Sequence, residues 1–187
     1  MNHYRIFFGF WLPIMFCTSA AAFNLQQGIH GMKWGSSITE YSELTKVHES
    51  NQAAYYANSN MFYRSANQPV PGVFYGFFKE QFFAVFIKLR SPAQFSHLER
   101  QFRTRHGAPK TTYIASNQQK IYRWVDRNLK IKLKMKESAA EYKLAIYYLP
   151  LAAKLNEEQL ERMPSEVFDR MPSNKDSAAK SSPLFGF

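Results

Sequence analysis

Four lysines alternate with apolar residues in one short segment, and they are the clearest candidates for chemistry in this chain. The segment Leu129–Lys136 reads LKIKLKMK. Successive side chains of a β-strand point to opposite faces, so a strand here separates the two sets completely. We expect the apolar set to face the core: Leu129, Ile131, Leu133 and Met135. We expect the cationic set to face away and to attract an anion: Lys130, Lys132, Lys134 and Lys136.

Two further cations extend this predicted anion-binding face. Arg123 and Lys143 lie on neighbouring candidate strands and can share its outward side. The chain carries a formal net charge of +10, which favours anionic partners such as lipid headgroups, lipopolysaccharide, cell-wall polymers or an acidic protein. The simpler interpretation stays open: a solvated sheet face whose lysines discourage edge pairing.

Recognisable catalytic constellations are missing from the sequence. It contains no G-x-S-x-G elbow, phosphate-binding Walker loop, H-E-x-x-H pair or clustered calcium-loop carboxylates. His97 and His106 are half a helical turn out of phase, so they cannot share a metal on one helix. Asp126 is best explained as a turn residue. We therefore expect no metal and no cofactor, and the pattern favours binding over catalysis.

Aromatic and basic residues adjoin in Tyr122-Arg123-Trp124, a combination that can stack on single-stranded nucleic acid. In a strand, however, Tyr122 and Trp124 share one face and are better explained as core residues. The pattern argues against a nucleic-acid partner.

The first 22 residues have the features of a secretory signal. Arg5 precedes an apolar run from Ile6 to Phe16, and Ala20-Ala21-Ala22 fits a cleavage site. The run is shorter than the roughly 20 apolar residues that span a bilayer, so we expect no transmembrane segment after cleavage. Cys17, the single cysteine, would leave with the signal, which excludes disulfides and thiolate sites. The prediction is a periplasmic or secreted protein.

Hydrophobic periodicity predicts an α+β domain over residues 23–162, with an antiparallel sheet and packing helices. A capping box at Ser37 and Glu40 predicts one helix; Ser91, Pro92 and Gly107 delimit another. The strand candidates are Gln52–Tyr56, Met61–Arg64, Val73–Phe78, Phe82–Leu89, Thr111–Ala115, Ile121–Val125, Leu129–Lys136 and Tyr142–Tyr148.

Two hairpins in this pattern resemble each other. Tyr75–Phe82 overlays Tyr122–Leu129, with aromatic, charged-turn and apolar positions in the same order. This predicts a tandem duplication of a helix-plus-strands unit, with chance similarity of amphipathic hairpins as the alternative. The segment Phe82–Ile87 is apolar on both faces, so we expect cover on each side of that strand.

The motifs GMKWGSS at Gly31–Ser37, RHGAP at Arg105–Pro109 and YRW…KIKL in the second hairpin resemble small exported bacterial α+β domains of unknown function. The resemblance covers Gly31–Tyr148. It implies a periplasmic α+β domain and supplies no catalytic residues.

The composition changes near Met163. After a helix expected at about Leu151–Arg162, residues 163–187 are polar and proline-containing, which predicts a flexible tail. The chain nevertheless ends in Pro-Leu-Phe-Gly-Phe. We expect either a frayed terminus or a peptide in which Leu184, Phe185 and Phe187 dock on an envelope partner.

Together these features predict an exported, non-catalytic binding or assembly module with a basic sheet face for an anionic envelope component. The alternative is an envelope-directed hydrolase of unrecognised class. A concave pocket with converging polar groups would favour the enzyme, and a flat or grooved patch would favour the binding module.

Overall fold

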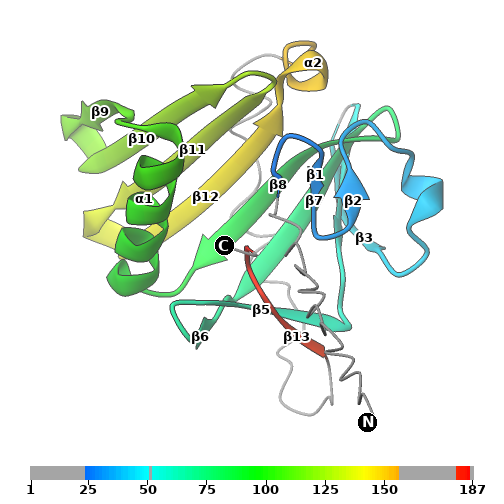
Figure 1. Cartoon of the computed structure of the whole chain (residues 1–187), viewed down its shortest axis with the longest axis horizontal. Helices are drawn as coiled ribbons and strands as arrows, with labels where there is room; N and C mark the ends of the chain where they lie inside the picture. The colour runs from blue at the N-terminus through cyan, green and yellow to red at the C-terminus, as the bar shows by residue number, and fades with distance from the viewer. Residues whose placement is uncertain (1–23, 51, 156–179, 186–187) are drawn as a thin grey trace, which may run out of the picture.

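The computed structural model describes residues 24–50, 52–155 and 180–185, and its largest element is an eight-stranded antiparallel sheet (Figure 1). The strand order is β3-β4-β7-β8-β12-β11-β10-β9. The bounds are β3 Thr45–Ser50, β4 Ala53–Ala57, β7 Gly72–Phe78, β8 Gln81–Leu89, β9 Lys110–Ile114, β10 Gln119–Asp126, β11 Leu129–Lys136 and β12 Glu141–Tyr148. The α+β expectation holds only in its coarse form, because the sheet dominates and the described helices are few.

Smaller elements surround this sheet. Two α-helices are described, α1 (Pro92–His106) and α2 (Leu149–Ala152), with single 3-10 turns η1 (Ile38–Glu40), η2 (Ala115–Asn117) and η3 (Glu137–Ala139). Strands β1 (Gly28–Ile29) and β2 (Met32–Lys33) form a hairpin. A three-stranded sheet has the order β13-β5-β6, with β13 at Lys180–Pro183, β5 at Met61–Ser65 and β6 at Gln68–Pro69.

Helix α1 begins and ends at the capping residues that the sequence predicts. The Ser91 hydroxyl accepts from the Gln94 backbone N–H, Pro92 is the first helical residue, and Gly107 caps the C-terminus at φ 77°. Phe95, Leu98 and Phe102 are buried against the sheet. The helix predicted between Ser91 and Gly107 is therefore confirmed, and its apolar side chains face the core.

The helix predicted from Ser37 is wrong beyond its first turn. Its capping box is present, yet only Ile38–Glu40 is helical. The Ile38 backbone N–H donates to the Glu80 carbonyl at 2.9 Å, which ties this segment to the turn between β7 and β8. The chain then continues into β3, an edge strand that the periodicity did not indicate.

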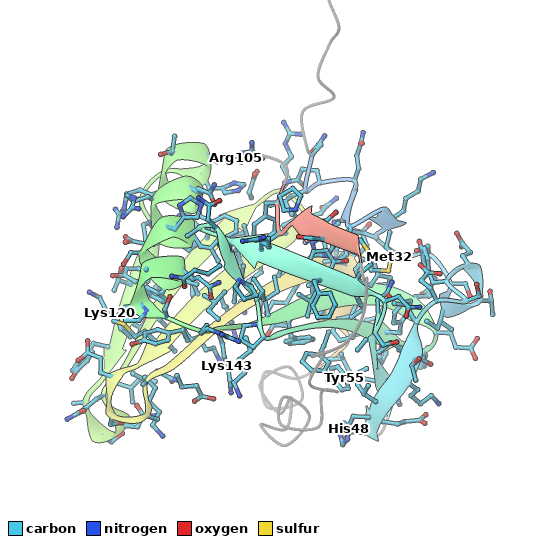
Figure 2. The ribbon with its side chains drawn as sticks, turned by 90° about the horizontal axis from the view of Figure 1, so that it is seen from below. Met32, His48, Tyr55, Arg105, Lys120 and Lys143 are labelled. Carbon is cyan, nitrogen blue, oxygen red and sulfur yellow. The ribbon has the colours of Figure 1, made fainter. Side chains whose placement is uncertain are left out.

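The main sheet has two faces of different character. We call the face covered by α1, the β1–β2 hairpin and the small sheet the inner face, and the opposite one the outer face (Figures 1 and 2). Val85, Ile87 and Leu89 of β8 point inward, whereas Ala84 and Phe86 point outward and pack with Leu151 of α2. All of these residues are buried, so the predicted two-sided burial of this strand is confirmed.

The order of the strands divides the sheet into two four-stranded halves, β3-β4-β7-β8 and β9-β10-β11-β12. The last strands of the halves, β8 and β12, pair with each other at the centre. By position β8 corresponds to β12, whereas the sequence overlay equates β8 with β11. The duplication itself stays a prediction.

The expectation of a flexible tail throughout residues 163–187 is wrong for its last part. Strand β13 pairs in parallel with β5, and the Leu184 backbone N–H donates to the Arg64 carbonyl at 2.8 Å. Leu184 and Phe185 are buried in the inner core, 1% and 6% exposed. They fill space beside α1, where the Phe185 and Phe102 rings lie 5.6 Å apart.

Some predictions cannot be compared with this structure. Residues 1–22 of the predicted signal, residues 163–179 of the predicted tail and Phe187 lie outside the described residues, as does the predicted helix beyond Leu155. The visible helix there, α2, begins at Leu149 and ends at Ala152. Among the residues that the structure describes, no helix is long and apolar enough to cross a membrane.

The burial of the chain end leads to a stability prediction. We expect Leu184→Ala to lower the free energy of unfolding by about 2–5 kcal/mol and Phe185→Ala by about 3–5 kcal/mol, because each leaves a cavity in the core. Chemical denaturation measures both. Val125→Ala is the control, since Val125 is 68% exposed and its truncation should change stability by about 0.5 kcal/mol or less. Equal effects for all three variants would contradict the observed packing.

Candidate anion-binding face

A row of three lysines crosses the outer face of the sheet. Lys134 on β11 lies directly opposite Lys143 on β12, and Lys143 lies directly opposite Lys88 on β8. Opposite residues of antiparallel strands have Cβ atoms about 4.5–5.5 Å apart, and like charges in such pairs repel. We call Lys88, Lys143 and Lys134 the lysine row. Glu141 forms an ion pair with Lys143, which offsets part of this charge.

Further cations flank the lysine row on β10 and β11. Arg123 lies opposite Lys132 and opposite Lys110 on β9. The Arg123 guanidinium donates to the Thr112 hydroxyl at 2.8 Å, which fixes its direction. Lys130 lies opposite Val125 and Tyr147. The strand register thus gathers the sequence-predicted cations on one face, and it adds Lys88 and Lys110, which the sequence analysis did not select.

The outer face is turned toward the bottom of the view in Figure 2. In Figure 2 the labelled Lys143 and Tyr55 point away from the side that carries α1 and β13. On β4, β7 and β8 this face is aromatic, with Tyr55, Phe74 and Phe86 in one buried cluster. On β10–β12 it is basic. The boundary between the two regions runs along β8 and β12, where Phe86 lies opposite Ala145 and Lys88 lies opposite Lys143.

Lys132 departs from the prediction. It lies on the outer face, as the alternation requires, but it is fully buried there instead of facing solvent. Its ammonium nitrogen lies 5.7 Å from the centre of the Tyr147 ring, an arrangement that allows a cation–π attraction. Lys132 therefore contributes positive charge beneath the face but presents no surface to an external anion. The other predicted cations, Lys130, Lys134, Lys136, Lys143 and Arg123, are half-buried.

The predicted docking residues at the chain end are not presented to a partner either. Leu184 and Phe185 belong to the inner core, and Phe187 lies outside the described residues. The sequence suggested docking because large apolar residues follow a polar segment. In this structure the segment docks on its own domain.

A cluster of His30, Tyr75 and Tyr63 holds residues 180–185 in place, and the sequence analysis missed it. His30 Nε2 donates to the Leu184 carbonyl at 2.8 Å, so the neutral ring accepts at Nδ1 from the Tyr75 hydroxyl at 2.9 Å. The Tyr63 hydroxyl donates to the Tyr75 oxygen at 2.7 Å. Burial lowers the pKa of His30 from 6.5 to about 4, against the raising effect of the Leu184 carbonyl.

A second histidine pairs with a carboxylate. His106 Nδ1 lies 2.9 Å from Asp126 Oδ2, and the His106 side chain is 5% exposed. Its Nε2 is buried and has no hydrogen-bond partner within the described part of the chain. Asp126 is therefore more than a turn residue, because it pairs with His106 of α1. The Trp124 indole donates to the Gly107 carbonyl at 2.8 Å. Together these two contacts anchor the C-terminus of α1 to β10.

A polar pocket of about 430 Å³ lies between α1, the β5–β6 turn and β13, with Ser65 and His97 among its lining residues. The Ser65 hydroxyl is buried without a hydrogen-bond partner among the described residues, so no base is positioned to activate it. Nor do the described residues include a group of three or more histidine, cysteine, aspartate or glutamate side chains that could hold a metal.

No protein-family model, curated protein or solved structure matches this chain.

The His30 cluster generates a pH prediction. The folded state holds His30 neutral down to about pH 4, whereas the unfolded chain protonates it near pH 6.5. The neutral state of His30 therefore contributes fully to the free energy of unfolding above pH 6.5. As the pH falls from 6.5 toward 4, the free energy of unfolding decreases by about 3 kcal/mol.

Denaturation of wild type and His30→Asn across this pH range measures the effect. Asparagine tolerates the φ of 53° at this position and does not titrate. We expect the stability difference between the two proteins to shrink as the pH falls from 6.5 to 4. A constant difference would show that His30 is not held neutral.

Proposed function

We propose that this protein is an exported, non-catalytic binding or assembly module that takes an anionic envelope component on its basic outer face. The observation that carries the proposal is the lysine row, in which three like charges occupy directly opposed positions on β8, β12 and β11. The signal-like residues 1–22 support export.

The lysine row holds like charges close together on paired strands. Strand pairing places Lys134, Lys143 and Lys88 side by side, so positive charge is concentrated on this part of the face, with Glu141 offsetting a share of it at Lys143. An anionic headgroup or polymer at this face relieves the repulsion and gains attraction from several cations at once. Each lysine or arginine near an anionic membrane surface contributes about 1 kcal/mol, so a few together suffice for salt-sensitive binding.

The alternative is an envelope-directed hydrolase that uses the polar pocket beside α1. In its favour, Ser65 and His97 line one cavity whose volume lies within the usual range for small-molecule sites, about 300–1,000 Å³. Against it, Ser65 lacks a hydrogen-bonded base among the described residues. We therefore prefer the binding module.

We also propose that the two halves of the sheet, β3-β4-β7-β8 and β9-β10-β11-β12, descend from a tandem duplication of a helix-plus-strands unit. The support is their shared order, in which each half ends on a central strand.

A charge-reversal pair tests the proposed function. We expect Lys134→Glu with Lys143→Glu to weaken binding to phosphatidylglycerol vesicles at least ~10-fold at low ionic strength, because four units of charge change at one face. Sedimentation with vesicles measures this binding, and added salt should weaken it in wild type.

The matched control is Lys33→Glu with Arg100→Glu, which makes the same change in net charge at exposed positions on β2 and α1. If both double variants lose affinity equally, net charge alone attracts the vesicles. If wild type fails to bind even at low ionic strength, the proposal is wrong.

A further inference from the structure

The polar pocket beside α1 has the size of a small-molecule site. Its volume is about 430 Å³, in the lower part of the range of about 300–1,000 Å³ that is usual for such sites. It is bounded by α1, by the turn between β5 and β6, and by β13 with the residues that follow it. Figure 1 shows β5 and β13 side by side, as their pairing requires. Segments that are distant in sequence therefore meet at one hollow.

The charge of the lining favours an acidic ligand. Arg64 supplies a positive charge, and no aspartate or glutamate in the described part of the chain lines the pocket. The Arg64 guanidinium donates to the Asn67 carbonyl at 2.9 Å, which holds it at the turn between β5 and β6. A guanidinium has several further N–H donors, and their planar arrangement matches the two oxygens of a carboxylate or phosphate.

The uncharged polar lining suits a ligand with hydroxyl groups. Ser181 and Ser182 of β13 contribute hydroxyls, and His97 and Gln101 of α1 contribute an imidazole and a carboxamide. The His97 and Gln101 side chains make no hydrogen bond with the described part of the chain. Groups that both donate and accept match the hydroxyls of a ligand, which do the same. Leu98 adds an apolar surface for the carbon skeleton.

A buried hydroxyl in the lining is a second sign of a ligand. Ser65 is 6% exposed, and its Oγ has no hydrogen-bond partner among the described residues. A buried polar group without a partner is unfavourable, and native structures contain few of them. A ligand oxygen that accepts from Ser65 in this pocket would supply the missing partner.

We propose that this pocket binds a monosaccharide-sized ligand that carries one acidic group, a carboxylate or a phosphate. Arg64 pairs with the acidic group, and the serine, carboxamide and imidazole side chains bind the hydroxyls of the ligand. The site is separate from the basic outer face, because it lies on the side of the sheet that carries α1 and β13. Since Ser181 and Ser182 are part of it, a bound ligand also stabilises residues 180–185 in their place.

Calorimetric titration of the full chain with glucuronate and with glucose 6-phosphate tests this site, with glucose as the uncharged probe. We expect saturable binding of at least one acidic probe with a Kd of roughly 1 mM or below, and binding of glucose at least ~10-fold weaker, because the charged hydrogen bonds are lost. Tighter binding of glucuronate assigns the acidic group as a carboxylate, and tighter binding of glucose 6-phosphate assigns it as a phosphate. No saturable binding of either acidic probe up to roughly 10 mM, or equal binding of glucose, overturns the proposal.

Single substitutions then locate the binding. Arg64→Gln should weaken it at least ~10-fold, whereas the matched control Arg100→Gln, at an exposed position of α1 outside the lining, should change it by no more than ~2-fold. Ser65→Ala should weaken binding about 5-fold, yet leave the free energy of unfolding unchanged or raised, because it removes an unpaired buried hydroxyl. Equal losses in the two arginine variants would show attraction by net charge alone and overturn the proposal. Unchanged binding in both Arg64→Gln and Ser65→Ala overturns it as well.

Discussion

The pairing of β8 with β12 is the interaction on which the rest of this structure depends. It joins two four-stranded halves into one sheet and buries the centre of that sheet on both faces. A strand buried on both sides must be apolar at almost every position, and β8 is apolar from Phe82 to Ile87. The exception is Lys88, which lies opposite Lys143 where the aromatic region of the outer face ends. The junction that builds the core therefore also brings the basic residues of the two halves together.

The inner face is completed by segments that are distant in sequence. The β1–β2 hairpin and residues 180–185 meet over β5 and β7, and His30 is hydrogen-bonded to both Tyr75 and Leu184. A buried neutral imidazole with both nitrogens satisfied costs little, whereas an imidazolium there would lack solvation. The cluster thus favours one arrangement of the β1–β2 hairpin with residues 180–185, and it makes the stability of that arrangement depend on pH. The outer face carries the gathered cations at its β10–β12 side, where we propose that an anionic partner binds.

Much of this fold follows from local patterns, and the misses share one physical cause. Strands with strict alternation, such as Leu129–Lys136, and the capped helix α1 could be predicted because their signals lie within a few residues. The alternation of residues 129–136 predicts on which face of the sheet Lys132 lies. It does not predict that Lys132 is buried, because burial depends on what covers that face. Residues 180–183 are polar and contain a proline, and they form a strand because β5 offers an open edge. The pairs His106–Asp126 and His30–Tyr75 are also long-range contacts, and a single sequence carries no local signal for them.

The most direct test of this account is to map where a soluble anionic headgroup binds. In a nuclear magnetic resonance titration with dihexanoyl phosphatidylglycerol, the account predicts that the largest shifts fall on Lys88, Lys134, Lys143 and their strand neighbours. The shifts should shrink as salt is added. Largest shifts on the exposed arginines of α1, such as Arg100, or no saturable shifts at any concentration, would contradict the assignment of the basic outer face as the binding surface.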